Sequence, residues 1–100
     1  MINQIFELYA RCGNSLKSIG INEAVLPINE IEYALELFLK TNLLILGGDI
    51  YEKDTSGNIV YAYASWSYDG TSVLSGIEES RSYLNQFTDN KLLVSFVIQN

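Results

Sequence analysis

The sequence lacks histidine and has one cysteine, one proline and only six basic residues among its 100 positions. Without histidine, the chain has neither the commonest general base nor the commonest zinc ligand. Because Cys12 is the sole cysteine, no disulfide can form within the chain, which indicates a reducing compartment. The scarcity of lysine and arginine argues against nucleic-acid binding, because phosphate contacts need clustered positive charge.

A membrane segment is also missing. No apolar run reaches the about 20 residues that span a bilayer. The first residues carry Glu7 and no basic cluster, so no signal peptide is expected. These absences predict a cytoplasmic protein that does not bind membranes. Hydrophobic residues make up 48% of the chain and no linker or repeat interrupts it, which predicts a single domain over residues 1–100.

Negative charge is the main compositional excess, with a net charge of −6 and a pI near 4.3. Such a surface favours a basic protein partner, although it also serves solubility alone. Segment 54–58 has some calcium-loop residues, but Gly57 stands in the fourth place and Ser65 in the twelfth, where a glutamate is needed. Cys12 has no histidine to activate it, so we interpret it as a buried, unreactive thiol. We therefore expect no metal, no cofactor and no catalytic residues.

Two β-rich runs dominate the middle of the chain, at residues 43–53 and 58–68, and they predict a β-hairpin. A three-residue loop over 55–57 closes as a type I turn with Gly57 in the left-handed region. Asp54 can accept hydrogen bonds from the turn amides. In the resulting register, Tyr51 faces Tyr61, Asp49 faces Tyr63 and Leu46 faces Trp66.

Side chains alternate across a sheet, so this register assigns two faces. One face is apolar and belongs to the core, with Gly48 making room for the indole of Trp66. It carries Leu44, Leu46, Gly48, Ile50, Val60, Ala62, Ala64 and Trp66. The other face is aromatic and polar, and it carries Asp49, Tyr51, Lys53, Tyr61, Tyr63 and Ser65.

Helical periodicity and capping patterns complete the expected fold. A first helix is predicted over 2–12, a second after a capping box at Asn29 and Glu32, and a third from a capping box at Ser75 and Glu78 to about residue 88. No strand is expected between the first two helices. A last strand over 91–99 has Leu92, Val94, Phe96 and Ile98 on one face. The fold class is α+β in the order α-α-β-β-α-β, with helices packed on a small antiparallel sheet built on a central hairpin.

The polar face of the hairpin is the candidate partner-binding site. It brings together Asp49, Tyr51, Tyr61 and Tyr63, and Asp69 follows at the strand end as the weakest member. Tyrosine is enriched at interface hot spots. The alternative is that a helix covers the tyrosines and that they are structural. A pocket holding Asp49 and the tyrosines would instead favour a small-molecule-binding or enzymatic domain.

The run LGGDIY at residues 46–51, followed by Tyr63 and by WSY at 66–68, resembles the Immunity protein 40 family of bacterial polymorphic toxin systems. Segment 15–24, SLKSIGINEA, is similar to the segment that those proteins carry before their second helix. The resemblance extends over nearly the whole chain, with a departure at Ala64 and Ser65. It implies a small cytoplasmic protein that binds and neutralises a cognate toxin domain. Many toxins of such systems are basic and attack nucleic acids, which suits the charge of −6.

Overall fold

The structure is a computed structural model that describes residues 2–16 and 23–99, with side chains described from residue 4. Its helices are α1 (Ile2–Cys12), α2 (Ile31–Lys40) and α3 (Val73–Leu84), and a short 3₁₀ helix, η2 (Ile28–Glu30), precedes α2. Its strands are β1 (Asn14–Ser15), β2 (Ala24–Pro27), β3 (Ile45–Lys53), β4 (Ile59–Ser67) and β5 (Leu93–Ile98). The strands form one antiparallel sheet in the order β1-β2-β5-β3-β4. The α+β class is therefore confirmed.

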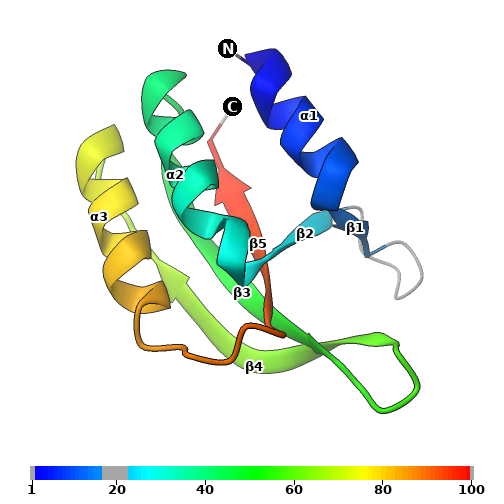
Figure 1. Cartoon of the computed structure of the whole chain (residues 1–100). Coiled ribbons are helices and arrows are strands. Elements are labelled where there is room, and N and C mark those ends of the chain that lie inside the picture. Colours follow the sequence, from blue (N-terminus) through cyan, green and yellow to red (C-terminus); the bar gives the residue numbers. More distant parts are fainter. Residues whose placement is uncertain (1, 17–22, 100) are drawn as a thin grey trace.

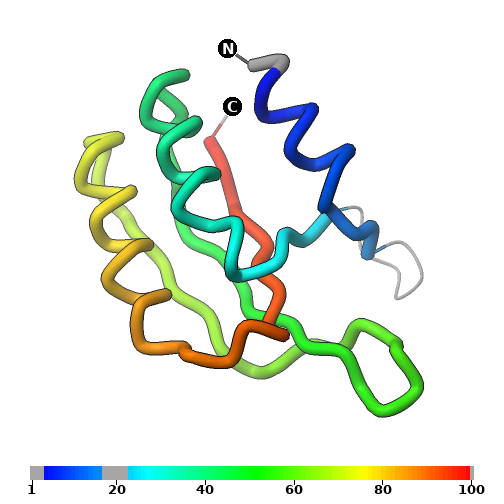
Figure 2. Tube along the Cα trace, viewed as in Figure 1, coloured from blue at the N-terminus to red at the C-terminus, as the bar shows by residue number. Residues whose placement is uncertain are grey.

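The three helices lie side by side on one face of the sheet (Figure 1). Their apolar stripes and the inner face of the sheet form the main core, because each element must bury its apolar side against another. This core includes Leu8 of α1, Leu35 of α2, Ile77 of α3, and Ile50 and Val94 of the sheet. The β3–β4 hairpin extends beyond the helical layer, so its turn projects away from the core (Figure 2). No described helix covers the opposite face of the sheet.

Two short strands, β1 and β2, were not expected from the sequence. They have two and four residues, which is too short for an alternating pattern to stand out. β2 joins the sheet through Leu26, which faces Val94 of β5, and β1 pairs with β2. The hairpin consequently lies at one end of the sheet, where β4 forms the edge.

Both predicted capping boxes are wrong in position. α2 follows the 3₁₀ turn and begins at Ile31, so Asn29 lies before the helix and caps nothing with its side chain. Glu32 instead forms an ion pair with Arg81 of α3, with 3.0 Å between Oε1 and Nε. α3 begins earlier than predicted, because the Ser72 hydroxyl accepts a hydrogen bond from the Ser75 amide at 3.2 Å. The helix ends at Leu84, four residues before the expected end.

The hairpin turn has the predicted geometry. Gly57 has φ 85°, in the left-handed region, and Asp54 Oδ1 accepts hydrogen bonds from the amides of Ser56 and Asn58 at 2.8 and 2.9 Å. Tyr51 faces Tyr61 as predicted.

Farther from the turn than this pair, the predicted register of β3 against β4 is wrong, because Asp49 faces Ser65 and Trp66 faces Gly48. A β-bulge places two extra residues, Ala62 and Tyr63, on β4. Since side chains alternate with period two, an insertion of two residues leaves the assignment of faces unchanged.

A second irregularity changes the faces at the start of β3. The register of β3 against β5 shifts between Ile45 and Gly47. Ile45 is fully buried in the main core, whereas Leu46 is only half-buried and lies outside it. The prediction that Leu46 packs beside Trp66 is therefore wrong. A register shift of one residue places the side chains that precede it on the opposite face of the sheet. Because residues 43–46 are all apolar, the sequence gives no sign of this shift.

A small second core lies on the other side of the sheet. It consists of Leu16, which follows β1, with Val25 of β2, Leu93 of β5 and Tyr51 of β3, and Ile59 packs against it. Leu16 and Val25 have no exposed surface. Leu16, just after β1, therefore covers part of the sheet face that the helices leave open. None of the described helices has the length and apolarity needed to cross a membrane.

Candidate functional site

The open face of the hairpin carries a row of three tyrosines, hereafter the tyrosine row: Tyr51 on β3, and Tyr61 and Tyr63 on β4. The ring centroids of Tyr51 and Tyr61 are 5.5 Å apart, and those of Tyr61 and Tyr63 are 5.1 Å apart, both with edge-on geometry. The Tyr61 hydroxyl donates to Asp49 Oδ1 at 3.4 Å. The structure thus brings together four of the five predicted site residues, and edge-on contacts favour a fixed arrangement of the rings.

Exposure rises along the tyrosine row from its inner to its outer end. Tyr51 is 4% exposed and belongs to the second core, covered by residues of the β1–β2 region and not by a helix. Tyr61 is 37% exposed and Tyr63 is 89% exposed. The buried ring supports the next one, which supports the last. The outer two tyrosines therefore offer contact area, while Tyr51 fixes their position.

Tyr63 has an unusual backbone. Its φ is 57°, in the left-handed region, which bulky residues seldom adopt because Cβ approaches the backbone. It lies in the β-bulge, where glycine is the residue that avoids this cost. A tyrosine held at a strained position with its ring almost wholly in solvent gains little from packing. Such outliers cluster at functional sites.

Replacing Tyr63 separates the strain from the ring. Tyr63→Gly removes both the ring and the left-handed penalty, whereas Tyr63→Ala removes the ring alone. The glycine variant is expected to be more stable than the alanine variant by about 1 kcal/mol, near the lower end of the penalty for a left-handed residue. Urea titration of both variants measures the difference. Equal stabilities would show that the backbone at this position is not strained.

Asp69, the fifth predicted residue, stands apart from the tyrosine row. It is exposed and lies two residues beyond the end of β4, and no described contact joins it to Asp49 or to the tyrosines. Asp49 and Asp69 are thus not a carboxylate pair.

A residue that sequence reasoning missed is Glu23, just before β2. Burial raises the pKa of the Tyr51 phenol above its usual 10.0, and the carboxylates of Asp49 and Glu23 raise it further. No sequence signal joined Glu23 to the hairpin, because that proximity depends on the unpredicted strand β2.

The ion pairs of the described chain lie on the helical side. Arg11, Lys40 and Arg81 pair with Glu30, Glu36 and Glu32, respectively. Asp49 has no cationic partner within residues 4–16 and 23–99. Three of the six basic side chains are thereby paired far from the hairpin, whereas Lys53 lies on the same face as Asp49, four residues along β3, without an ion pair in the described chain. A half-buried, uncompensated carboxylate among aromatic rings suits contact with a cation.

A cavity of about 320 Å³ lies elsewhere, between the start of α2 and the end of α3. Its lining includes Ile28, Glu32, Arg81 and Phe87, and it contains none of the five predicted site residues. A pocket holding Asp49 and the tyrosines would have favoured a small-molecule site. This cavity is not such a pocket. Within the described residues, no group of three or more metal-ligating side chains is present.

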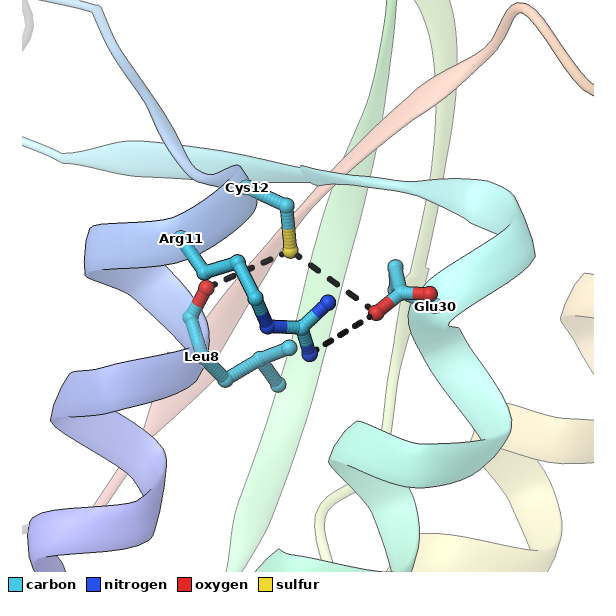
Figure 3. Close-up of polar contacts among 4 residues, drawn as sticks. All are labelled: Leu8, Arg11, Cys12 and Glu30. Atoms are coloured by element: carbon cyan, nitrogen blue, oxygen red, sulfur yellow. Dashed lines mark hydrogen bonds and ion pairs between the residues drawn. The ribbon is translucent and has the colours of Figure 1, made fainter.

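Cys12 lies at the end of α1 with its sulfur between two oxygens (Figure 3). The thiol donates to the Leu8 carbonyl at 3.2 Å and lies 3.9 Å from Glu30 Oε1, and Arg11 reaches the same carboxylate at 3.1 Å. Burial and the Glu30 carboxylate raise the pKa of the thiol, and Arg11 opposes this only in part. The side chain is half-buried, not fully buried as expected. The raised pKa still disfavours the nucleophilic thiolate.

Neither the curated proteins nor the solved structures contain a match to this chain. A protein-family profile, described as Immunity protein 40, matches residues 15–98. The match includes both strands of the hairpin, the tyrosine row, α2, α3 and β5, so it spans the open face and most of the core. The chain therefore belongs to the Immunity protein 40 family.

Proposed function

We propose that this protein binds and neutralises a cognate bacterial toxin domain by direct contact and without catalysis. Membership of an immunity-protein family supports a toxin-neutralising role. The absence of histidine from the sequence and the raised pKa of Cys12 fit a binding function, because neither a common general base nor a thiolate is at hand. The proposed site of action is the cytoplasm.

The binding surface that we propose is the open face of the hairpin, with Asp49, Tyr61 and Tyr63 in contact with the toxin. Tyr51 supports them from beneath, and Asp69 belongs to the periphery of the surface. The observation that carries this assignment is the exposed ring of Tyr63 on a left-handed backbone, next to Tyr61 and its hydrogen-bonded partner Asp49, which forms no ion pair in the described chain. Tyrosines provide a large contact area at low entropic cost, and the carboxylate provides charge complementarity.

The partner that fits this surface is basic. The protein carries a net charge of −6, and Asp49 on the hairpin face forms no ion pair in the described chain. Opposite charges steer association and suppress wrong partners. A toxin that acts on nucleic acids needs clustered lysine and arginine to hold phosphates. We therefore propose a nuclease domain as the toxin type, and an acidic surface that covers such a cluster would also block its substrate.

The test uses the toxin domain encoded beside this protein's gene. Tyr63→Ala is expected to weaken binding by about 2 kcal/mol, the level of an interface hot spot, and Asp49→Asn by about 1 kcal/mol. Calorimetry gives the affinities, and thermal melts show whether the variants stay folded. The asparagine keeps an acceptor for Tyr61, so a loss of binding reports the charge.

Matched control variants lie on the helical side of the molecule. Tyr33 of α2 is 42% exposed, close to the value for Tyr61, and Glu79 of α3 is exposed without an ion pair in the described chain. Tyr33→Ala and Glu79→Gln should leave the affinity unchanged. If these variants weaken binding and the hairpin variants do not, the toxin docks on the helices and the assignment of the surface is wrong.

A further inference from the structure

The outer edge of β4 has features of a strand that needs a partner. Among the described strands, β4 pairs only with β3, and it ends the sheet order β1-β2-β5-β3-β4. No backbone hydrogen bond joins its outer edge to another described segment. Its sequence, IVYAYASWS, has nine residues with no charge and no proline. Proteins usually protect such edges with lysine, proline, short strands or a covering segment, because an open edge is a template for pairing.

The β-bulge is the one protective feature that β4 has, and it interrupts the edge without removing it. Four residues precede Tyr63 in β4 and four follow it, so each flank is long enough to pair. The Tyr63 ring lies between the two flanks and is 89% exposed. A segment bound along β4 would therefore pass this ring, and the edge is continuous with the face already proposed for toxin contact.

The hydrogen-bond pattern identifies the backbone groups that point outward. The Asp54 amide donates to the Asn58 carbonyl at 2.8 Å, and the Tyr68 amide donates to the Leu46 carbonyl at 2.8 Å. In an antiparallel ladder, hydrogen-bonded and non-hydrogen-bonded pairs alternate along the strand. Counting from each end, the N–H and C=O groups of Tyr61, Ser65 and Ser67 point away from β3. The side chains of all three residues are exposed, so access to these groups is open.

We propose that an extended segment of the toxin domain pairs with the outer edge of β4 and becomes a sixth strand of the sheet. The inference rests on the proposed toxin-binding function and names its mode of recognition, addition of a strand. Backbone pairing supplies affinity, and the neighbouring side chains supply specificity. Beside this edge stand Tyr61, Tyr63 and the Asp49 carboxylate, which favour a segment that carries a lysine or an arginine.

A second copy of this chain is the less suitable occupant. Each copy carries a net charge of −6, and edge-to-edge pairing would bring the two hairpins and their carboxylates together. Like charges oppose such an association, whereas a basic toxin segment gains from the same charges. The occupant we assign is therefore the toxin and not another copy of this protein.

The test compares two substitutions at Ser65. Ser65→Pro removes the outward N–H and places a ring on the edge, but leaves the hydrogen bonds to β3 in place, and proline is tolerated on edge strands. Ser65→Thr changes the side chain and keeps the N–H. The proline variant is expected to bind the toxin domain at least about tenfold more weakly, because one pairing bond is lost and its neighbour is obstructed. The threonine variant should bind as the wild type does.

Hydrogen exchange of the wild-type protein gives an independent readout, which remains available if the proline variant does not fold. The amides of Tyr61, Ser65 and Ser67 should exchange rapidly in the free protein and slowly in the complex. If the wild type binds the toxin but these amides stay unprotected, the strand addition is wrong and the proposed function stands. If the wild type does not bind the toxin, both proposals fail. If these amides exchange slowly in the free protein, and sedimentation shows that the free protein is a dimer, the edge pairs with a second copy of this chain and the proposal is overturned.

Discussion

Trp66→Ala is expected to lower the free energy of unfolding by about 3–5 kcal/mol, the usual cost of truncating a large aromatic residue in a core. The indole joins β4 to α3 and β5. It stacks on Tyr83 of α3 with ring centroids 5.3 Å apart, and it forms a T-shaped pair with Phe96 of β5 with centroids 5.8 Å apart. Alanine would leave a cavity between these rings, which belong to different elements and cannot close together without moving α3.

A polar contact fixes the orientation of the indole. Trp66 Nε1 donates to Ser80 Oγ at 3.0 Å, and the Ser80 hydroxyl donates to the Gly76 carbonyl at 2.8 Å. Ser80 has no exposed surface, so the indole N–H supplies a partner that water cannot replace. Trp66→Phe keeps an aromatic ring and loses this bond, and it should cost less than Trp66→Ala. Guanidinium titration measures both variants. A loss below about 1 kcal/mol for the alanine variant would show that the indole contributes no more than a surface residue does.

The hairpin turn was predictable because its determinants are local. Gly57 alone in the loop accepts a left-handed backbone without penalty, and the Asp54 side chain reaches the amides two and four residues ahead. These two facts fix the pairing of Tyr51 with Tyr61. The apolar face of β5 was predictable for a similar reason, since Val94 and Phe96 alternate with residues of the other face and both are buried.

The bulge at Tyr63 was not predictable from the same pattern. A β-bulge is usually recognised by glycine, and here the left-handed position is occupied by tyrosine. The insertion of two residues also keeps the alternation of apolar and polar side chains intact, so the sequence shows no break. At the start of β3, residues 43–46 are all apolar, and alternation gives no information on which of them face the helices.

The helix starts and the burial of Tyr51 were not predicted, for two different physical reasons. Asn29 has the spacing of a capping residue, but Pro27 begins a 3₁₀ turn that delays α2. Tyr51 alternates with core residues along β3 and so lies on the face opposite the helices, but Leu16 and Val25, from a distant part of the chain, pack over it. Several serines and asparagines within a few residues could each serve as the N-cap of a helix, and the burial of a side chain depends on long-range contacts. Neither is determined by local spacing, which is why the sequence assigned the tyrosine row to one face but left open which of its rings are covered.

Gly48→Ala is expected to destabilise the protein by about 3 kcal/mol, at the upper end of the usual cost of overpacking. A Cβ atom at this position would overlap the Ser95 carbonyl oxygen and the edge of the Trp66 indole. The carbonyl belongs to the backbone of β5, the central strand of the sheet, and cannot yield. The indole cannot yield freely either, because Tyr83, Phe96 and Ser80 hold it.

Gly57→Ala is the matched control, because the two glycines isolate two different costs. At Gly57 φ is 85° and nothing lies within 4 Å of a Cβ atom, so alanine meets only the conformational penalty of about 1–2 kcal/mol. At Gly48 the backbone conformation is ordinary, and only the space for a Cβ atom is missing.

Double substitution with Trp66→Ala tests the cause of the Gly48→Ala loss. Removal of the indole should relieve part of the stability lost in Gly48→Ala and none of the stability lost in Gly57→Ala. Additive losses for Gly48 and Trp66 would mean that the glycine in the GGD sequence is required by β5 alone. A coupled loss would show that this glycine is present to admit the tryptophan, and that the two most distinctive parts of the hairpin sequence form one packing unit beneath the proposed toxin-binding face.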